Sequence, residues 1–316
     1  MRKTPVLCVV GPTASGKTAL SLRLAHALGG EIVNMDSMQV YRRMDIGTAK
    51  ATPEERAAVR HHMLDVAEPG ENYSVARYVE DASRCCDELL AAGKLPVIVG
   101  GTGLYIDSLI SGRDFAGRDD GDAALREVLS AQYDRLGGET MLARLRSFDA
   151  ERADRLHPAD KRRIIRAIEV HTLTGLTITE HDERTRALPK RYDAAYIILS
   201  FRDRAALYSR IDARVDAMVE RGLFEEVEGL LASGLPADCT SMQAIGYKEA
   251  AMALRGDISR EAAAERIKQN SRRYAKRQLT WFGHEPEARW IRWDGEPDFE
   301  AARLLSTEFL HSRGIS

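Results

Sequence analysis

Residues 5–28 read PVLCVVGPTASGKTALSLRLAHAL and decide the fold. The apolar run from Pro5 to Val10 predicts a buried strand. Leu20, Leu24, Ala27 and Leu28 share one helical face and predict a helix from Lys17 to Leu28. The residues between them fit the pattern G-x-x-x-x-G-K-[ST]: Gly11, Pro12, Thr13, Ala14, Ser15, Gly16, Lys17 and Thr18. In such a loop, backbone amides and a helix N-terminus cradle phosphate oxygens, so we expect a diphosphate or triphosphate site. The pattern does not say which molecule carries the phosphates.

Short apolar runs continue to alternate with helical patterns, which is typical of a parallel sheet covered by helices. We therefore expect an α/β fold with a P-loop NTPase-like parallel sheet as its core. The other predicted strands are Glu31–Met35, Leu95–Val99, Ala194–Phe201, Ala288–Trp293 and a short one at Met63–Val66. Long helices are predicted at Ser74–Ala92, which Ser74 can cap, and at Phe299–Leu310.

The stretch from about Gly112 to Arg191 contains no convincing strand and is rich in Arg, Asp and Ala. It predicts a helical insertion domain at 113–191. The core would then be formed by residues 1–112 and 192–316, with helices in the C-terminal part.

Composition argues against a disordered, disulfide-stabilised or membrane protein. The 316 residues are 44% hydrophobic and carry 46 Lys+Arg against 48 Asp+Glu, which argues against disorder. The four cysteines form no C-x-x-C pair, so neither a disulfide scaffold nor a cysteine zinc site is expected. No apolar run is long enough for an export signal or a membrane span. We expect a cytoplasmic protein without membrane contact.

The loop after the second strand begins with Asp36, followed by Ser37, Met38 and Gln39. Ligands of open α/β sheets bind beyond the carboxyl ends of the strands. A carboxylate there can face the phosphate loop and accept a proton from a nucleophile. Alternatively, Asp36 caps a helix, and the two roles can coexist.

After the strand at 95–99, the chain runs into Gly100-Gly101-Thr102-Gly103. An ordinary P-loop ATPase places an acid near such a strand to manage Mg²⁺ and water. Here the loop offers only backbone and the Thr102 hydroxyl. It indicates close approach to a ligand, although a plain turn would look the same.

Basic residues cluster in two places, at Lys161 to Arg166 and in the run RIKQNSRRYAKR from Arg266 to Arg277. Each alone is typical of a solvated helix face, but together they favour a polyanionic partner. Arg210 and Arg214 are four apart and share a helix face. Either can reach a bound pyrophosphate, or both can pair with acids on their own helix.

Taken together, these motifs resemble the bacterial tRNA dimethylallyltransferase family, also called tRNA isopentenyltransferases. The resemblance rests on motifs in consistent order along nearly the whole chain: GPTASGKT (11–18), DSMQVYR (36–42), DIGTAK (45–50), YSVARY (73–78), LPVIVGGTGLYI (95–106), RRIIRAIEV (162–170), RVDAMVERGLFEEV (214–227), QAIGYKE (243–249) and YAKRQLTWF (274–282).

The resemblance implies transfer of a dimethylallyl group from dimethylallyl diphosphate to N6 of adenosine at position 37 of tRNAs reading codons that start with U. It implies Mg²⁺ as cofactor and the tRNA anticodon stem-loop as partner, clamped by the insertion. We also expect a monomer.

The resemblance also assigns roles to residues. The loop 11–18 would hold the diphosphate, with Lys17 as a catalytic charge and Thr18 as the metal ligand. Asp36 would be the general base, with Thr102 and Arg214 as further catalytic residues. The tRNA-contacting residues would be Asp36, Ser37, Met38, Gln39, Thr102, Arg162, Arg163, Ile164, Ile165, Arg166, Gln243, Ala244, Ile245, Gly246 and Tyr247.

Two other readings of the residues stay open. A small-molecule kinase of the P-loop class also places an acid after the second strand, and a non-catalytic RNA-binding NTPase would share the loop. The missing acid after Val99 and the two basic clusters disfavour the kinase. We find no nucleotide-sensing loops that would support the NTPase.

Overall fold

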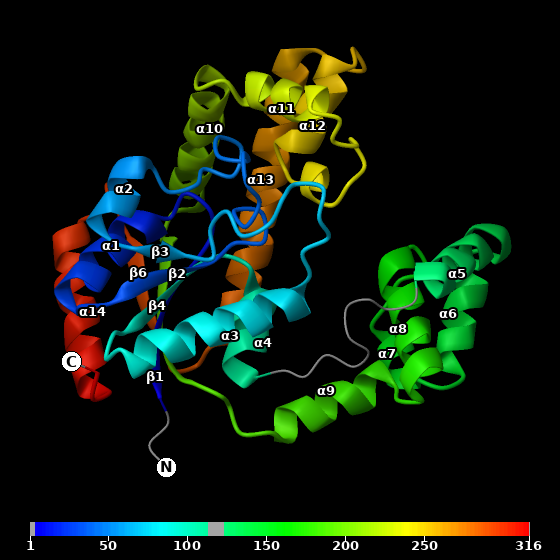
Figure 1. Cartoon of the computed structure of the whole chain (residues 1–316), viewed down its shortest axis with the longest axis horizontal. Helices are drawn as coiled ribbons and strands as arrows, with labels where there is room; N and C mark the ends of the chain where they lie inside the picture. Colours follow the sequence, from blue (N-terminus) through cyan, green and yellow to red (C-terminus); the bar gives the residue numbers. More distant parts are fainter. Residues whose placement is uncertain (1–3, 113–122, 316) are drawn as a thin grey trace.

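A six-stranded parallel sheet forms the centre of the computed structural model, which describes residues 4–112 and 123–315 (Figure 1). The strand order is β3-β2-β4-β1-β5-β6. In the middle, Leu7 of β1 is paired with Val97 of β4 on one side and Ala195 of β5 on the other. The strands are β1 (Pro5–Val10), β2 (Glu31–Met35), β3 (His61–His62), β4 (Pro96–Gly100), β5 (Asp193–Phe201) and β6 (Arg289–Trp293). The predicted α/β fold with a parallel sheet is confirmed.

Helices cover both faces of the sheet. Alternate residues of β1 belong to different clusters: Leu7 and Val9 pack in one, and Val6, Cys8 and Val10 in the other. The helices are α1 (Lys17–Ala27), α2 (Pro53–Ala58), α3 (Val75–Ala91), α4 (Gly103–Ser111), α5 (Ala123–Leu136), α6 (Gly138–Arg146), α7 (Ala150–Asp154), α8 (Lys161–Thr174), α9 (Ile178–Ala187), α10 (Arg204–Glu220), α11 (Leu223–Ala232), α12 (Tyr247–Leu254), α13 (Arg260–Phe282) and α14 (Phe299–Ser312).

The short strand expected at Met63–Val66 is wrong. Strand β3 lies just before it, where His61 and His62 pair with β2. Met63 and Asp65 have φ of 62° and 56°, which breaks the extended conformation that a strand needs. The predicted strands at 5–10 and 31–35 have the bounds that the structure shows.

Between α4 and β5, the described part of the chain contains helices α5 to α9 only. Residues such as Leu129, Leu145, Ile164 and Ile168 form a hydrophobic cluster of their own, separate from the two clusters of the sheet. Figure 1 shows α5 to α8 projecting to one side of the sheet, with α9 leading back to it. The start of the expected insertion, 113–122, lies outside the described residues.

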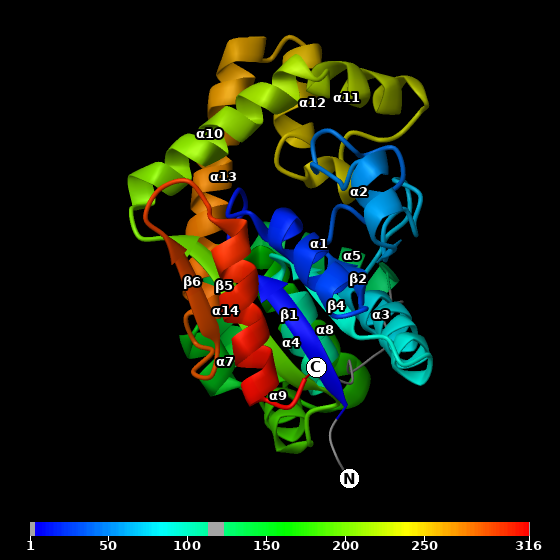
Figure 2. The ribbon, with the colours of Figure 1, turned by 90° about the vertical axis from the view of Figure 1, so that its left-hand side faces the viewer.

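Helices α10 to α13 stand above one end of the sheet (Figure 2). Helix α13 spans 23 residues and is tied to α10 by ion pairs, in which Arg272 and Lys268 bind Asp212 and Asp216 at 2.5 and 2.7 Å. This end is the carboxyl edge of the strands, so these helices roof the loops that follow β1, β2 and β4. Among the described helices, none is long and apolar enough to cross a membrane.

Candidate active site at the carboxyl edge of the sheet

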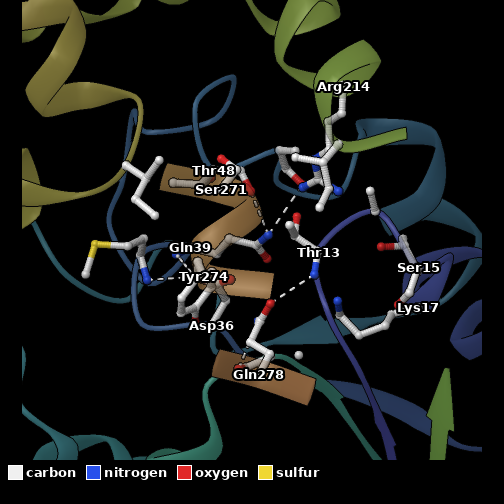
Figure 3. A pocket seen from close by; sticks show the side chains of 18 of the residues that line it. Thr13, Ser15, Lys17, Asp36, Gln39, Thr48, Arg214, Ser271, Tyr274 and Gln278 are labelled. Carbon is white, nitrogen blue, oxygen red and sulfur yellow. Dashed lines mark hydrogen bonds between the residues drawn. The ribbon is translucent and has the colours of Figure 1, made fainter. Parts of the chain in front are cut away.

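A cavity of about 900 Å³ lies between the carboxyl edge of the sheet and the helices above it. Its walls come from the loop after β1, the loop after β2, α10 and α13, whose side chains point inward together (Figure 3). This volume is in the usual range for a small-molecule site. The cavity contains the sequence-predicted residues Thr13 to Thr18, Asp36 to Gln39 and Arg214.

The phosphate loop has the backbone that its glycines allow. Gly11 and Gly16 have φ of 145° and 92°, and a Cβ on Gly11 would lie 2.4 Å from the Leu199 carbonyl oxygen. Behind the loop, the Trp293 indole of β6 donates a 2.9 Å hydrogen bond to the Ser15 carbonyl. The backbone of the loop is therefore packed against the adjacent strands β5 and β6.

Lys17 is the first residue of α1 and curls back over the loop. Its ammonium donates hydrogen bonds to the carbonyl oxygens of Gly11 and Pro12, at 3.1 and 2.7 Å. Burial, together with the positive charge of Arg214 and against the opposing effect of Asp36, lowers the pKa of Lys17 to about 7. An anion bound next to this ammonium would favour its charged form.

Arg214 lines the cavity from α10, opposite the phosphate loop in Figure 3. Burial lowers its pKa, Asp36 opposes this, and its buried Nε has no hydrogen-bond partner among the described residues. Arg210 also lines the cavity, but it bonds Glu296 at 3.1 Å. Pairing with acids on their own helix is not observed for either arginine, because Asp212 and Asp216 pair with α13 as described above.

Asp36 follows β2 and lines the cavity. Its Oδ1 accepts hydrogen bonds from the amides of Met38 and Gln39, at 2.8 and 3.4 Å. These are cap-like bonds, but the segment after Asp36 is a turn and not a helix. Its other oxygen has no hydrogen-bond partner among the described residues, so one carboxylate can hold the turn and still serve a ligand.

The rest of this loop is anchored by charged side chains, of which Lys50 is buried. The Lys50 ammonium, 1% exposed, binds Asp45 at 2.6 Å and Asp65 at 2.8 Å. Glu226 of α11 accepts the amides of three consecutive residues, 45–47, at 2.7 to 3.1 Å. The Gln39 amide in turn donates 3.0 Å to the Thr48 carbonyl. The loop that carries Asp36 is thereby fixed to the helical roof.

The glycine loop after β4 lies between these two loops. A Cβ on Gly100 would lie 2.4 Å from the Met35 carbonyl oxygen, so strand β2 leaves no room for a side chain there. Thr102 precedes α4 but makes no side-chain cap; its hydroxyl accepts the Ser37 amide at 3.4 Å instead. Thr102 thus contacts the segment of Asp36, although it is not among the described residues that line the cavity.

Sequence reasoning missed the face of α13 that lines the cavity, formed by Ile267, Ser271, Tyr274 and Gln278. Burial raises the pKa of Tyr274 to about 12. The spacing of four, three and four residues was the available signal, since it marks one helix face. The surrounding basic residues hid it, because they made the stretch resemble a solvated surface.

Only some of the residues expected to contact tRNA between 243 and 247 line the cavity. Gln243, Ala244 and Ile245 line the cavity, whereas Gly246 and Tyr247 are buried behind it. The Tyr247 side chain has no exposed surface, and its hydroxyl bonds Glu226. The Tyr247 side chain is therefore a core side chain in this structure, and its assignment to tRNA binding stays a prediction.

Two of the residues expected to contact tRNA on α8 are buried as well. Ile164 and Ile165 are 0% and 8% exposed and pack in the core of the insertion, so they hold the helix and do not face a macromolecule. Arg166 bonds the fully buried Glu169 at 2.9 Å, beside Arg126. Arg162 and Arg163 are exposed.

Thr18 is exposed at the start of α1 and lines the cavity. The described residues hold no group of three or more His, Cys, Asp or Glu that could bind a metal ion. The Thr18 hydroxyl alone still fits Mg²⁺, because this ion commonly takes one protein oxygen together with substrate phosphate oxygens and waters.

Comparisons with known proteins cover nearly the whole chain. The profile of the family described as IPP transferase matches residues 39–285, and that of isopentenyl transferase matches residues 4–69. The tRNA dimethylallyltransferase of Exiguobacterium sibiricum is 46% identical over 291 residues, which cover 92% of this chain and 90% of that protein. The tRNA dimethylallyltransferase of Geobacter sulfurreducens is 43% identical over 308 residues, which cover 98% and 97%.

Solved structures of enzymes with the same kind of name are also similar to this chain. The tRNA isopentenylpyrophosphate transferase of Bacillus halodurans is 39% identical with a TM-score of 0.71, covering 99% of this chain and 98% of that chain. A eukaryotic dimethylallyltransferase acting on tRNA is 26% identical with a TM-score of 0.82, covering 99% and 81%. Both the phosphate loop and α13 lie within the matched residues.

Proposed function

Because this chain belongs to the family of tRNA dimethylallyltransferases, its reaction is a prenyl transfer to tRNA, and we propose that the acceptor is N6 of adenosine 37 in tRNAs reading codons that start with U. The donor is dimethylallyl diphosphate, and the products are N6-dimethylallyladenosine and pyrophosphate. The chain is thus a transferase of alkyl groups other than methyl. Because the chain belongs to this family, we no longer consider the small-molecule kinase and the RNA-binding NTPase as alternative functions.

One observation carries the proposal: a phosphate loop, an arginine and a carboxylate line a single cavity. The phosphate loop of an ATPase would need an acid after β4, and this chain has Gly100-Gly101 there. A prenyl diphosphate brings its own leaving group, so the loop needs no hydrolysis machinery.

On the donor side, the bond between the allylic carbon and the diphosphate oxygen breaks, and both electrons leave with the pyrophosphate. Negative charge therefore grows on the departing group in the transition state. Lys17 and Arg214 lie where they can stabilise it, and both are buried enough for the interaction to be strong.

On the acceptor side, the exocyclic nitrogen of adenine attacks that carbon and must lose a proton. Asp36 would take it through the oxygen not engaged by the turn, which is general-base catalysis. The adenine must leave its stack to reach the cavity, so the nucleotide is flipped out of the anticodon loop. Thr102 and Gln39 would position it.

We propose Mg²⁺ as the cofactor, held by Thr18 and the diphosphate; when bound, it neutralises charge on the leaving group. The anticodon stem-loop would contact the exposed basic residues of α8 and α13, Arg162, Arg163, Arg273 and Lys276. A tRNA substrate implies a cytoplasmic location, and we propose that the chain acts as a monomer.

The test is transfer without nucleotide. Protein, Mg²⁺, dimethylallyl diphosphate and a tRNA with adenosine 37 are incubated without ATP, and the nucleosides are analysed by mass. We expect a mass increase of one dimethylallyl group on adenosine 37. A matched tRNA with inosine 37, which lacks the exocyclic amine, should gain nothing. Strict dependence on ATP would refute the proposal.

A further inference from the structure

We propose that Gln278 is a positioning residue that holds the donor loop and the acceptor loop in register for prenyl transfer. The inference rests on the proposed function, because that function makes the loop after β1 the donor side and the segment around Asp36 the acceptor side. It adds a role for a residue of α13.

The Gln278 side chain joins the phosphate loop to the glycine loop. Its Oε1 accepts the Thr13 amide at 3.0 Å, and its Nε2 donates to the Gly101 carbonyl oxygen at 3.0 Å (Figure 3). The residue is 5% exposed, so water does not compete freely for these bonds. Thr13 and Gly101 are 88 positions apart in the sequence, and one amide fixes the distance between them.

The glycine loop is shaped around this amide. A Cβ on Gly101 would lie 1.9 Å from the Gln278 Nε2 and 3.3 Å from the Gly11 carbonyl oxygen. The contact is therefore possible only with glycine at that position. Because the next residue, Thr102, accepts the Ser37 amide, the link continues to the segment that carries Asp36.

One helical turn before Gln278, Tyr274 lines the same cavity. Burial raises the pKa of Tyr274 to about 12, so its hydroxyl stays protonated beside Gln278. Of these two residues on one helix face, Gln278 is the one that bonds both the glycine loop and the phosphate loop. A carboxamide suits this place because it both donates and accepts, which neither a carboxylate nor a thioether can do.

Misplacing reacting groups by about 1 Å can cost on the order of 100-fold in rate. We expect Gln278→Met, which keeps the length but loses both bonds, to lower the single-turnover rate about 10- to 100-fold at saturating tRNA and donor. The dissociation constants of inorganic pyrophosphate and tRNA should change less than about threefold, since phosphate and tRNA contacts remain. The control is Leu310→Ala on α14, fully buried and outside the cavity lining. It lowers thermal stability without touching the loops, and its rate should stay near that of the wild type.

Gln278→Glu gives a readout that a merely structural residue would not move. The carboxylate can accept from Thr13 but cannot donate to Gly101, whereas its protonated form can do both. The rate of Gln278→Glu relative to the wild type should therefore rise as the pH is lowered from 8 to 6.

A Gln278→Met rate within threefold of the wild type, an equal loss in Leu310→Ala, or a pH-independent Gln278→Glu ratio would each overturn the role of Gln278. A wild-type protein that forms no prenylated adenosine would overturn the proposed function instead.

Discussion

Donor binding should draw a proton from solution onto Lys17. With a pKa of about 7 in the unliganded protein, Lys17 carries its proton in only ~10% of molecules at pH 8. A bound diphosphate places negative charge against the ammonium and favours the charged form. Donor binding should therefore take up ~0.9 proton per site at pH 8 and ~0.5 at pH 7.

The lowered pKa of Lys17 also predicts how donor affinity and protein stability change with pH. Donor affinity should fall as the pH rises above 7, because the neutral amine must first be protonated. In the unliganded protein, the unfolded chain holds a proton between pH 7 and 10.5 that the folded chain lacks. Lys17 therefore destabilises the folded protein at pH 7 and below, and this penalty is relieved as the pH rises from 7 to 10.5, so the free energy of unfolding increases with pH.

Isothermal titration calorimetry in two buffers of different ionisation enthalpy measures the proton number directly. Dimethylallyl diphosphate is titrated into protein saturated with inosine-37 tRNA, on which no transfer can occur. Lys17→Met is the matched control, because it subtracts protons that belong to the donor itself. Equal proton uptake by the wild type and Lys17→Met would refute the assignment of a neutral Lys17.

Three further predictions follow from the site. Asp36→Asn should lower the single-turnover rate by ~10² to 10⁴ with tRNA affinity within a few fold, because it removes the general base and keeps the turn; a near-normal rate would leave Asp36 as a cap. Replacing Arg162 and Arg163 by Gln should flatten the slope of log K against log salt for tRNA by ~0.7 to 0.9 per lost phosphate contact, measured by filter binding. An unchanged slope would mean that neither arginine contacts a tRNA phosphate. Lys50→Met should destabilise the protein by ~1 to 3 kcal/mol in urea unfolding, since it leaves the buried Tyr41 carbonyl unpaired while Asp65 keeps Arg56; a loss below ~0.5 kcal/mol would contradict this.

Local patterns predicted what is local in the structure. The strand, loop and helix from Pro5 to Leu28 were readable because one short segment makes the whole phosphate site. Asp36 was readable because parallel strands end at one edge of the sheet. Gln278 was not, since its partners Thr13 and Gly101 are brought to it only by the tertiary fold.

Carrying a motif over as a whole placed buried residues of α8 and α12 among the expected tRNA contacts. Within the stretch 162–166, the helix turns about 100° per residue, so a contacting face cannot include every position. Ile164, Ile165 and Ile168 repeat at helical spacing and mark the buried face. At Tyr247, the aromatic ring was an equally plausible contact or core residue, and only burial distinguishes the two.

The order of the strands has a consequence for synthesis on the ribosome. Strand β1 needs β5 as a neighbour, but 92 residues separate the end of β4 from the start of β5. At ~5 to 20 residues per second, the apolar edge of β1 waits unpaired for roughly 5 to 20 s after β4 has emerged. An open edge of this kind is a template for aggregation. During that interval the nascent chain depends on shielding by its own helices or by chaperones, and expression should suffer more from slowed translation across the insertion than from slowing after β5.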